Sequence, residues 1–390
     1  VPFQLFEKSN RLGGMIRTET VDEFTVDTGP DSLLVQKPAA IQLVNELGLS
    51  DQLISTQKPR TAYVYRQESL LPLPYSSELG IPTKLRPLIT NGLLSWQGRA
   101  RMLADLVISS KQDRSDESVA DFFRRRFGQE SVDYIAEPLL AGIHAGDVDQ
   151  LSMQALFPRL VTAEHDYGSV IKGLRHLYSE DASERKRNGV FRSFSDGLET
   201  FTRELAKTIP TNTIHKNIEI TAISGHSPLQ IHQGGNPVST ADQVISTLPA
   251  HTLGNLTTSL NTKLSSLCNV ISYTSIAIVV LGFLREHVGH PLDGSGLVVP
   301  RTEPNMTISA ATWISSKWPH RAPHDHILLR AFVGGFRAPT ALSQSDEKLI
   351  ASVLLDFQQL LSTTGTPVLA KVYRWPAANP LSLIHISEPT

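Results

Sequence analysis

The sequence predicts an α/β protein of the α+β type, in which one fold is interrupted by a long helical insertion. Three observations lead to this class. Strand-like and helical segments mix in residues 1–75, helical patterns dominate residues 76–190, and strands with a few helices fill the chain to about residue 373. A chain of 390 residues with 40% hydrophobic content has the composition of a globular protein with two or three domains.

The bulk chemistry excludes several classes of protein. A formal charge of -2 and a pI of about 6.7 give no global attraction to nucleic acid. The single cysteine, Cys268, excludes intramolecular disulfides and zinc sites built from paired cysteines, and we expect it as a buried apolar residue in a strand. The longest apolar run, residues 276–284, is shorter than the ~20 residues that span a bilayer. No signal peptide is recognisable, so a cytoplasmic protein is expected.

The first half of the chain begins with strands and continues with helices. Residues 1–35 predict a strand, a glycine-rich turn and a short second strand, and residues 38–56 predict a helix from their apolar spacing. Residues 61–73 alternate like a hairpin. Helical patterns follow, with Ser118 as a candidate N-cap, at residues 85–94, 96–109, 118–127, 132–140 and 152–163. Residues 184–189 predict a solvated connection.

The second half is richer in strands. A helix is predicted over residues 196–205, a turn at 234–236 and further helical turns at 250–267. Strands are predicted at residues 213–223, 228–232, 242–247, 271–283, 296–300, 306–310 and 327–334. A last helix at 345–361 precedes a strand at 367–373. Residues 381–390 continue no earlier pattern, and we expect them to be a tail foreign to the fold.

The run EKSNRLGGMIR at residues 7–17 carries the first chemical signal. In a dinucleotide-binding fold, an acidic residue at the end of the second strand accepts hydrogen bonds from the ribose hydroxyls. Glu7 ends a strand-like segment, where that residue belongs. Gly13 and Gly14 give the backbone room to pass close to a ligand. A surface carboxylate and an ordinary tight turn are the alternative interpretations.

Together with DTGPDS at residues 27–32, this run resembles the flavin amine oxidase superfamily. Later segments narrow the resemblance to its protoporphyrinogen oxidase family. Residues 138–147, 151–153, 157–158 and 167–169 are similar to that family's helical domain in order and spacing. Its substrate-domain strands resemble residues 291–300 and 328–335, and its returning flavin-domain strand resembles residues 242–249. The specificity comes from the ordered set, which extends to about residue 380.

The resemblance implies a discontinuous, Rossmann-like FAD-binding domain, a mixed-sheet substrate domain and a helical insertion that can face a membrane. The FAD-binding parts are expected at residues 1–37, 191–255 and 374–380, the substrate-domain parts at 38–75 and 256–373, and the helical domain at 76–190. The first strand and the GxGxxG turn of the FAD-binding domain are expected upstream of Val1. The chain alone is therefore expected to bind flavin weakly or not at all.

The resemblance also assigns cofactor contacts, position by position. At the adenosine end of FAD, we expect Glu7 and Lys8 to contact the ribose and the backbone of Ile220 to contact the adenine side. Along the flavin, we expect contacts from Gly13, Gly14 and Met15. Around the ring system, we expect Gly29, Pro30, Asp31 and Ser32, with Trp375 near the isoalloxazine. For Ile220, a core position explained by strand alternation is the alternative.

Two residues are implied for the substrate. Arg60 opens the predicted hairpin, where similar enzymes hold an arginine that pairs with a propionate, and a guanidinium can grip a carboxylate bidentately. Gly142 would let a flat macrocycle lie against backbone, and a glycine at a helix C-terminus is the alternative. No general acid or base is assigned, His144 included, because hydride chemistry belongs to the cofactor and the protein supplies geometry.

The implied activity is FAD-dependent oxidation of protoporphyrinogen or coproporphyrinogen to the porphyrin in haem synthesis, with oxygen as acceptor. The sequence leaves the choice of substrate and the oligomeric state open. An amine oxidase or carotenoid desaturase-like enzyme, or an inactive fragment, is the alternative. Peripheral membrane contact through the helical domain, and product hand-over to ferrochelatase, are also expected. The membrane expectation rests on basic residues beside apolar ones, with solvated helix faces as the alternative, at Lys84, Arg86, Arg99, Arg101, Arg124, Arg125 and Arg126.

Overall fold

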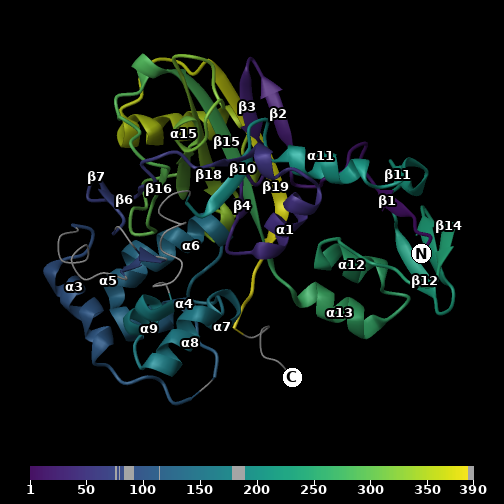
Figure 1. The fold of residues 1–390 in the computed structure, drawn as a ribbon, viewed down its shortest axis with the longest axis horizontal. Coiled ribbons are helices and arrows are strands. Elements are labelled where there is room, and N and C mark those ends of the chain that lie inside the picture. The colour runs from purple at the N-terminus through teal and green to yellow at the C-terminus, as the bar shows by residue number, and fades with distance from the viewer. Residues whose placement is uncertain (75–76, 79, 83–91, 114, 178–188, 385–390) are drawn as a thin grey trace.

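The computed structural model describes residues 1–74, 77–78, 80–82, 92–113, 115–177 and 189–384. A large mixed sheet forms its centre, a helical region lies on one side of this sheet, and a smaller α/β module lies on another (Figure 1). Chain segments from before and after the helical region meet in the centre. The mixed α/β fold class predicted from the sequence is confirmed.

Within the described residues, the largest sheet has seven strands. In spatial order they are β19 (Leu369–Pro380), β15 (Tyr273–Leu284), β18 (His326–Gly334), β17 (Ala310–Trp313), β16 (Gly296–Val298), β6 (Ala62–Arg66) and β7 (Ser69–Pro72). All neighbours are antiparallel except β16 and β6, which run parallel. The strands predicted at residues 271–283 and 327–334 are confirmed. β19 is longer than predicted, since residues 374–380 continue it along β15.

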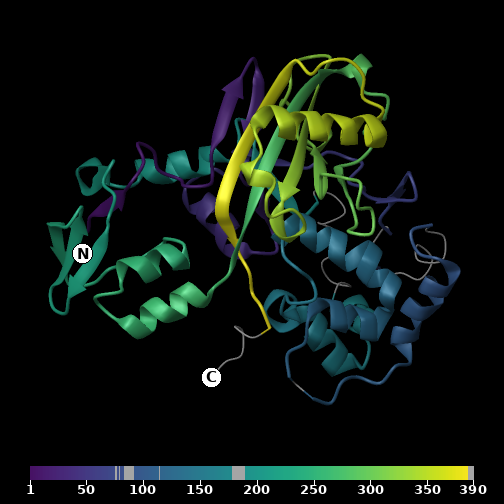
Figure 2. The same ribbon diagram turned by 180° about the vertical axis from the view of Figure 1, so that it is seen from behind.

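Strand β15 is buried on both faces of the sheet. Ala277, Val279 and Leu281 belong to the core beneath helix α15 (Asp346–Leu361), which lies across the sheet in Figure 2. Ile278 and Val280 belong to the opposite core. That core is closed by a hairpin made of β2 (Thr18–Val21) and β3 (Phe24–Asp27). Because side chains alternate between the faces of a strand, burial on both faces requires the continuous apolar run seen in the sequence.

A small sheet joins the two sides of the insertion. β10 (Phe191–Phe194) pairs antiparallel with β4 (Leu33–Leu34) on one edge and with β5 (Leu53–Ser55) on the other. The helix predicted over residues 38–56 is too long, because α1 (Pro38–Glu46) ends early. Gly48 then takes a left-handed φ of 69°, and a 3₁₀ turn at Ser50–Gln52 leads into β5.

The smaller module pairs β1 (Leu5–Glu7) with β11 (Ile214–Lys216) in parallel. The module also contains α11 (Glu199–Lys207), β12 (Ala222–Gly225), β13 (Leu229–Gln233), β14 (Asn236–Ala241), α12 (Ala250–Leu256) and α13 (Thr262–Val270). The predicted turn is confirmed, with positive φ at Gly234 and Gly235.

Two predictions in this module are wrong. Residues 242–247 form no strand, and Ile245 is 91% exposed. Among the described strands none pairs with this segment, so its backbone N–H and C=O groups have no neighbouring strand to bond with. The alternating pattern of its side chains is therefore not enough to form a strand. Cys268 is buried as expected but lies in α13 rather than in a strand. The N-cap Asn261, which accepts from Leu264 N, starts that helix.

The helical region has its own core of buried apolar side chains. Its main helices are α3 (Trp96–Leu103), α4 (Val119–Phe127), α6 (Glu137–His144), α7 (Met153–Leu156), α8 (Pro158–Tyr167) and α9 (Val170–Leu177), with a π-helical stretch at Val132–Ala136. Ser118 caps α4 by accepting from Asp121 N, as predicted. The single helix predicted over residues 152–163 is split, since Pro158 starts α8. Most of the predicted elements at 85–94 and 184–189 lies outside the described residues.

The basic cluster of this region is largely engaged inside it. Arg126 is fully buried and its Nε donates to Asp105 Oδ1 at 2.6 Å. Arg125 binds Glu117 and Glu164, with nitrogen–oxygen distances of 2.6 Å to each. Lys84 and Arg86 lie outside the described residues. These arginines therefore organise the helices, and among described residues no helix has the length and apolar character needed to cross a bilayer.

Removal of the buried guanidinium of Arg126 should lower the free energy of unfolding of the helical region. Arg126→Ala leaves the carboxylate of Asp105 buried without its ionic partner, which typically costs about 3–5 kcal/mol. Arg124→Ala, on the same helix but with 41% of its side chain exposed, should cost less than about 1 kcal/mol. Urea unfolding followed by circular dichroism measures both. Equal losses in the two variants would show that the buried pair has no special role.

Candidate active site

The loop that follows β3 makes a close backbone contact with the glycine turn. A Cβ at residue 29 would lie 2.2 Å from the backbone oxygen of Met15, so only glycine fits. Trp375, on β19, reaches the same loop: its Nε1 donates to Thr28 O at 2.7 Å, and its ring lies 3.6 Å from that Cβ position. The fold therefore brings the remote Trp375 to Met15 and Gly29, which lie on either side of the β2–β3 hairpin.

The glycine turn at Gly13 and Gly14 is fixed by contacts with Thr202 and Arg11. Gly13 and Gly14 have φ values of 104° and 55°, which favour glycine. A Cβ on Gly13 would meet Thr202 Oγ1 at 2.9 Å, whereas the space at Gly14 is open. Arg11 donates to Gly14 O and Ile16 O at 2.7 and 2.5 Å, which fixes the shape of the turn. Arg11 belongs to the motif, but sequence reasoning gave it no role.

Glu7, Lys8 and Ile220 lie in the smaller module. Glu7 ends the parallel strand β1, as predicted, and its Oε1 accepts from Ser9 N at 2.8 Å. Lys8 is exposed and lies 3.6 Å from a carboxylate oxygen of Glu219. The side chain of Ile220 is partly buried and packs against the small core of this module.

Asp31 is part of a buried charge cluster, which consists of Asp27, Asp31, Lys317, Arg321 and Arg330, each less than 10% exposed. Asp31 Oδ2 accepts from Lys317 Nζ at 2.7 Å and from the neighbouring Trp318 Nε1 at 3.0 Å. Arg330 donates to Gly29 O at 2.9 Å, and Arg321 lies 3.3 Å from Asp27. The cluster thereby fastens the loop at residues 27–32 to the central sheet.

The surroundings shift the pKa values of the two carboxyl groups of the cluster in opposite directions. Burial alone raises the pKa of Asp31, but the charges of Lys317 and Arg330 outweigh burial and hold this pKa well below its ordinary value of 3.8. Burial raises the pKa of Asp27, and Arg321 only partly opposes the rise. Asp31 is therefore the firmly ionised member of the pair.

Sequence reasoning missed the three cations of this cluster. Arg330 lies in the middle of β18, which is otherwise apolar except at His326, and such a charge in a buried strand was the available signal. Arg330 Nε and two nitrogens of Arg321 are buried without a described hydrogen-bond partner. A buried N–H donor without a partner is energetically costly, so these nitrogens could donate hydrogen bonds to one more acceptor group.

The remaining predicted residues are placed as follows. Pro30 is exposed beside Gly29, and Ser32 Oγ donates to Asp31 Oδ1 at 2.9 Å. Arg60 is half-buried before β6, and its Nη2 donates to Thr56 O at 2.8 Å. Burial, followed by the nearby charge of Arg192, lowers the pKa of Arg60.

Gly142 lies in the last turn of α6, two residues before the end of that helix at His144. A Cβ on Gly142 would come within 3.2 Å of the Cβ of Ala310 on β17, so the glycine lets α6 pack closely on the central sheet. The side chain of His144 lies outside the described part of the structure.

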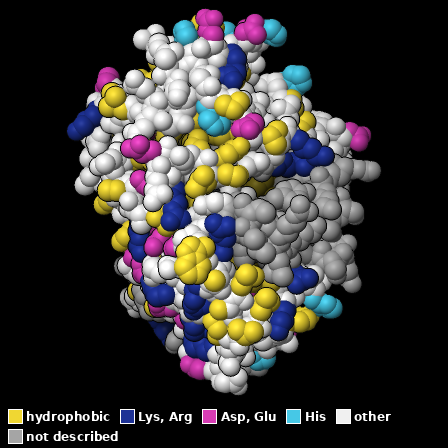
Figure 3. Space-filling model, turned by 90° about the vertical axis from the view of Figure 1, so that its left-hand side faces the viewer, with side chains coloured by type: hydrophobic (Ala, Val, Ile, Leu, Met, Phe, Trp, Pro, Cys, Tyr) yellow, Lys and Arg dark blue, Asp and Glu magenta, His cyan; other side chains and the backbone are white. Residues whose placement is uncertain are grey.

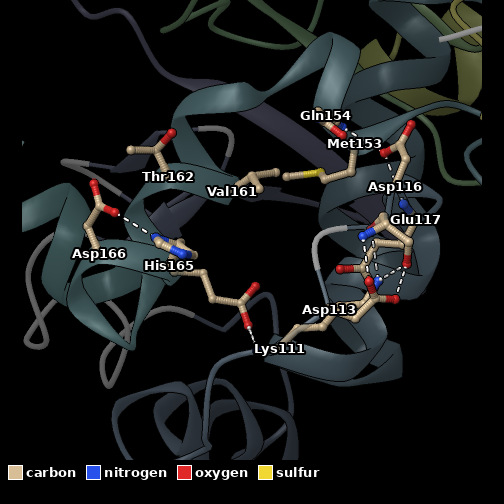
Figure 4. Close-up of a pocket in the computed structure, with 12 residues that line it drawn as sticks. Lys111, Asp113, Asp116, Glu117, Met153, Gln154, Val161, Thr162, His165 and Asp166 are labelled. Carbon is tan, nitrogen blue, oxygen red and sulfur yellow. Dashed lines mark hydrogen bonds and ion pairs between the residues drawn. The ribbon is translucent and has the colours of Figure 1, made fainter. Parts of the chain in front are cut away.

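A pocket of about 350 Å³ lies elsewhere, within the helical region (Figure 4). None of the predicted site residues lines it. Its carboxylates already have partners: Asp116 accepts from Gln154 N at 3.0 Å, Glu117 and Glu164 bind Arg125, and Asp166 contacts His165. An internal network of ion pairs and hydrogen bonds therefore lines the pocket, and each of these four carboxylates is already engaged.

Comparison with known proteins identifies the family. Residues 1–387 match the family described as flavin containing amine oxidoreductase. The chain belongs to this family. The coproporphyrinogen III oxidase of Bacillus subtilis (strain 168) is 35% identical over 380 residues, which are 96% of this chain and 80% of that protein. Protoporphyrinogen oxidase 2 of Arabidopsis thaliana is 28% identical, over 97% of this chain and 79% of that protein.

Solved structures of other proteins have the same fold. A structure assigned as a protoporphyrinogen oxidase from Exiguobacterium sp. 255-15 has a TM-score of 0.84 and 30% identity, and the match covers 98% of this chain and 82% of that one. Reduced UDP-galactopyranose mutase has a TM-score of 0.69 at 19% identity, over 98% of this chain and 78% of that one, which shows the fold alone. The cofactor of the oxidoreductase is FAD. The residues fit such a group, because Gly29 permits close backbone contact, Gly14 borders open space and buried donors lack acceptors.

Loss of the lysine in the charge cluster should be costly. Lys317→Met removes the closest cation from the buried carboxylate of Asp31, and we expect the free energy of unfolding to fall by about 3–5 kcal/mol. Lys371→Met, at an exposed position of β19, should change it by less than about 0.5 kcal/mol. Guanidinium unfolding at neutral pH measures both variants.

The same pair predicts an acid dependence. The pKa of Asp31 in the folded protein is depressed, so its ionisation stabilises the fold fully above about pH 4 and this contribution is lost as the pH falls towards the folded-state pKa. Lys317→Met should flatten that acid limb in unfolding curves recorded between about pH 2 and 7. An unchanged limb would mean that other carboxylates determine the acid sensitivity.

Proposed function

We propose that the chain catalyses FAD-dependent oxidation of a porphyrinogen, protoporphyrinogen or coproporphyrinogen, to the porphyrin in haem synthesis, with oxygen as the electron acceptor. One observation carries the proposal. The relatives named coproporphyrinogen III oxidase and protoporphyrinogen oxidase match this chain almost from end to end, at up to 35% identity. Similarity of that extent covers every region from which the candidate site is built.

We propose that FAD is held by residues of three regions. The ribose would be bound by Glu7 at the end of a parallel strand, with Lys8 beside it, and the backbone of Ile220 would face the adenine side. The ring system would lie along the glycine turn, the loop after β3 and the indole that contacts this loop, a set made of Gly13, Gly14, Met15, Gly29, Pro30, Asp31, Ser32 and Trp375. We propose, in addition, the FAD-binding parts predicted from the sequence, at residues 1–37, 191–255 and 374–380.

Each oxidation step removes a hydride from a macrocycle carbon and a proton from a pyrrole nitrogen. The chemistry that bound FAD would supply is hydride acceptance, with oxygen as the final electron acceptor. The protein's part is positional. The ion pair of Asp31 with Lys317 and the bond from Trp375 to Thr28 fix the loop, and Arg60 would bind a propionate at the mouth of the site. From the family resemblance we also propose that the backbone of Gly142 borders the macrocycle, although its Cβ position is already taken up by the contact of α6 with Ala310.

The activity can be tested directly. The full-length protein loaded with FAD, mixed with reduced protoporphyrinogen or coproporphyrinogen in air, should produce porphyrin fluorescence faster than the spontaneous rate, and the faster substrate names the physiological one. Arg60→Gln should raise KM about tenfold or more with a smaller change in kcat, because a charge-assisted bond to the substrate is lost. Arg203→Gln, an exposed arginine of α11, is the matched control.

A lack of porphyrin from folded, FAD-loaded protein would contradict the proposal. An amine or carotenoid substrate would then become the working hypothesis, since solved amine oxidases share the fold. Loss of activity in Arg203→Gln equal to that in Arg60→Gln would instead show a general effect of removing arginines.

We propose in addition that the helical region contacts a membrane surface peripherally. Trp96 and Val107 are 73% and 84% exposed. Figure 3 shows hydrophobic and basic side chains side by side over this part of the molecule, the combination that interfacial binding requires. Hand-over of the product to ferrochelatase stays a prediction from the family resemblance.

Exchange of the exposed apolar residues tests the membrane contact. Trp96→Ser combined with Val107→Ser should weaken co-sedimentation with anionic phosphatidylglycerol vesicles about tenfold or more, because apolar area no longer enters the interface. Val368→Ser, 50% exposed on the loop before β19, serves as the control. Absence of vesicle binding by the unaltered protein would refute the proposal.

A further inference from the structure

The buried charge cluster holds more cations than carboxylates. Its acids are Asp27 and Asp31, and its cations are Lys317, Arg321 and Arg330. Lys317 Nζ lies 2.7 Å from Asp31 Oδ2, and Arg321 Nη2 lies 3.3 Å from Asp27 Oδ2. These two ion pairs use both carboxylates of the cluster. When all five groups are ionised, one positive charge is therefore in excess, and the geometry assigns it to Arg330.

The surroundings of Arg330 do not neutralise this charge. Its Nη2 lies 3.7 Å from Asp31 Oδ1, a carboxylate that already binds Lys317 more closely. Burial lowers the pKa values of Lys317 and Arg321, the nearby acids oppose that effect, and the charge of Arg330 adds to it. Asp196 also acts on Arg321, but it is exposed and solvent screens it. A buried charge in this position favours a negative charge nearby.

The excess cation lies one hydrogen bond from the loop proposed to border the flavin ring. Arg330 Nη1 donates to Gly29 O at 2.9 Å and to Asp27 O at 3.3 Å. Trp375 contacts the same loop through its bond to Thr28 O. Arg330 is only 5% exposed, so water and salt screen its charge much less than they screen a charge on the surface. Its field therefore reaches the space beside the loop.

We propose that Arg330 is an electrostatic residue of the active site, whose buried charge stabilises the negative charge that a flavin ring gains on accepting hydride. In that transfer a C–H bond of the macrocycle breaks, and its electron pair forms the new bond between the hydrogen and a ring nitrogen. The ring thereby gains one negative charge. The inference rests on the FAD binding of the proposed function and deepens it, because it names a residue that makes the bound ring a stronger hydride acceptor.

Sulfite binding tests this charge without turnover. Sulfite adds to the ring of oxidised flavin and forms a negatively charged adduct, so its affinity reports positive charge near the ring. In the full-length protein loaded with FAD, Arg330→Gln should raise the Kd of sulfite about tenfold or more and lower the midpoint potential of the flavin. Arg330→Lys retains the charge and should bind sulfite within about threefold of the unaltered protein. Glutamine can still donate to Gly29 O, so a role limited to holding the loop predicts equal results for the two variants.

Lys371 provides a matched control. Lys371 on β19 and Arg330 on β18 both pair with Val280 of β15, so the two cations lie in one row of the sheet. Lys371 is exposed, whereas Arg330 is buried. Because solvent screens an exposed charge, Lys371→Gln should change the Kd of sulfite by less than about twofold.

The remaining outcomes separate this inference from the proposed function. Arg330→Gln is expected to fold, since two matched ion pairs remain in the cluster. If it does not fold, Lys317→Met decides in its place, because it lowers the charge of the cluster by the same amount. Unchanged sulfite affinity and potential, equal changes in the glutamine and lysine variants, or a folded Arg330→Gln that cannot hold FAD overturns the inference and leaves the proposed function standing. The expected weakening of sulfite binding, in a protein that forms no porphyrin, upholds the inference and overturns the substrate. Failure of the unaltered protein to bind FAD overturns both.

Discussion

The buried ion pair between Asp31 and Lys317 is the interaction on which the candidate site depends. The two residues are 286 positions apart, yet their charged atoms lie 2.7 Å from one another inside the protein. A buried carboxylate is tolerated only when cations and hydrogen bonds compensate it, and here Trp318 and Arg330 complete the compensation. The loop after β3 is thereby held against the central sheet.

The sheet can serve as this support because both of its faces are covered. Helix α15 packs on one face and the hairpin of β2 and β3 on the other, and the hairpin delivers the loop directly to the strand that carries Arg330. The helical insertion leaves and returns beside this loop, through β4, β5 and β10. Its own stability comes from a separate core and from the buried pair of Arg126 with Asp105.

The site is assembled from segments that the chain keeps far apart, on a fold that it shares with solved structures of quite different names. The glycine turn and the loop after β3 are local features. Trp375 closes on them only because β19 runs beside β15. By contrast, the pocket of the helical region is lined by carboxylates that already serve neighbouring helices, so a cavity alone does not mark the chemistry of this protein.

The sequence by itself determined the local features. The long apolar strand β15, helix α15, the cap at Ser118, the glycine turn and the loop at residues 27–32 were predictable, because periodicity and glycine act over a few residues. The tertiary structure alone decided what depends on remote partners. Gly142 became a helix-packing residue, residues 242–247 formed no strand, Arg126 was buried, and the cations of Lys317, Arg321 and Arg330 were gathered around two aspartates. Burial and ion pairing are properties of the surroundings of a residue, and those surroundings come from segments that no local pattern specifies.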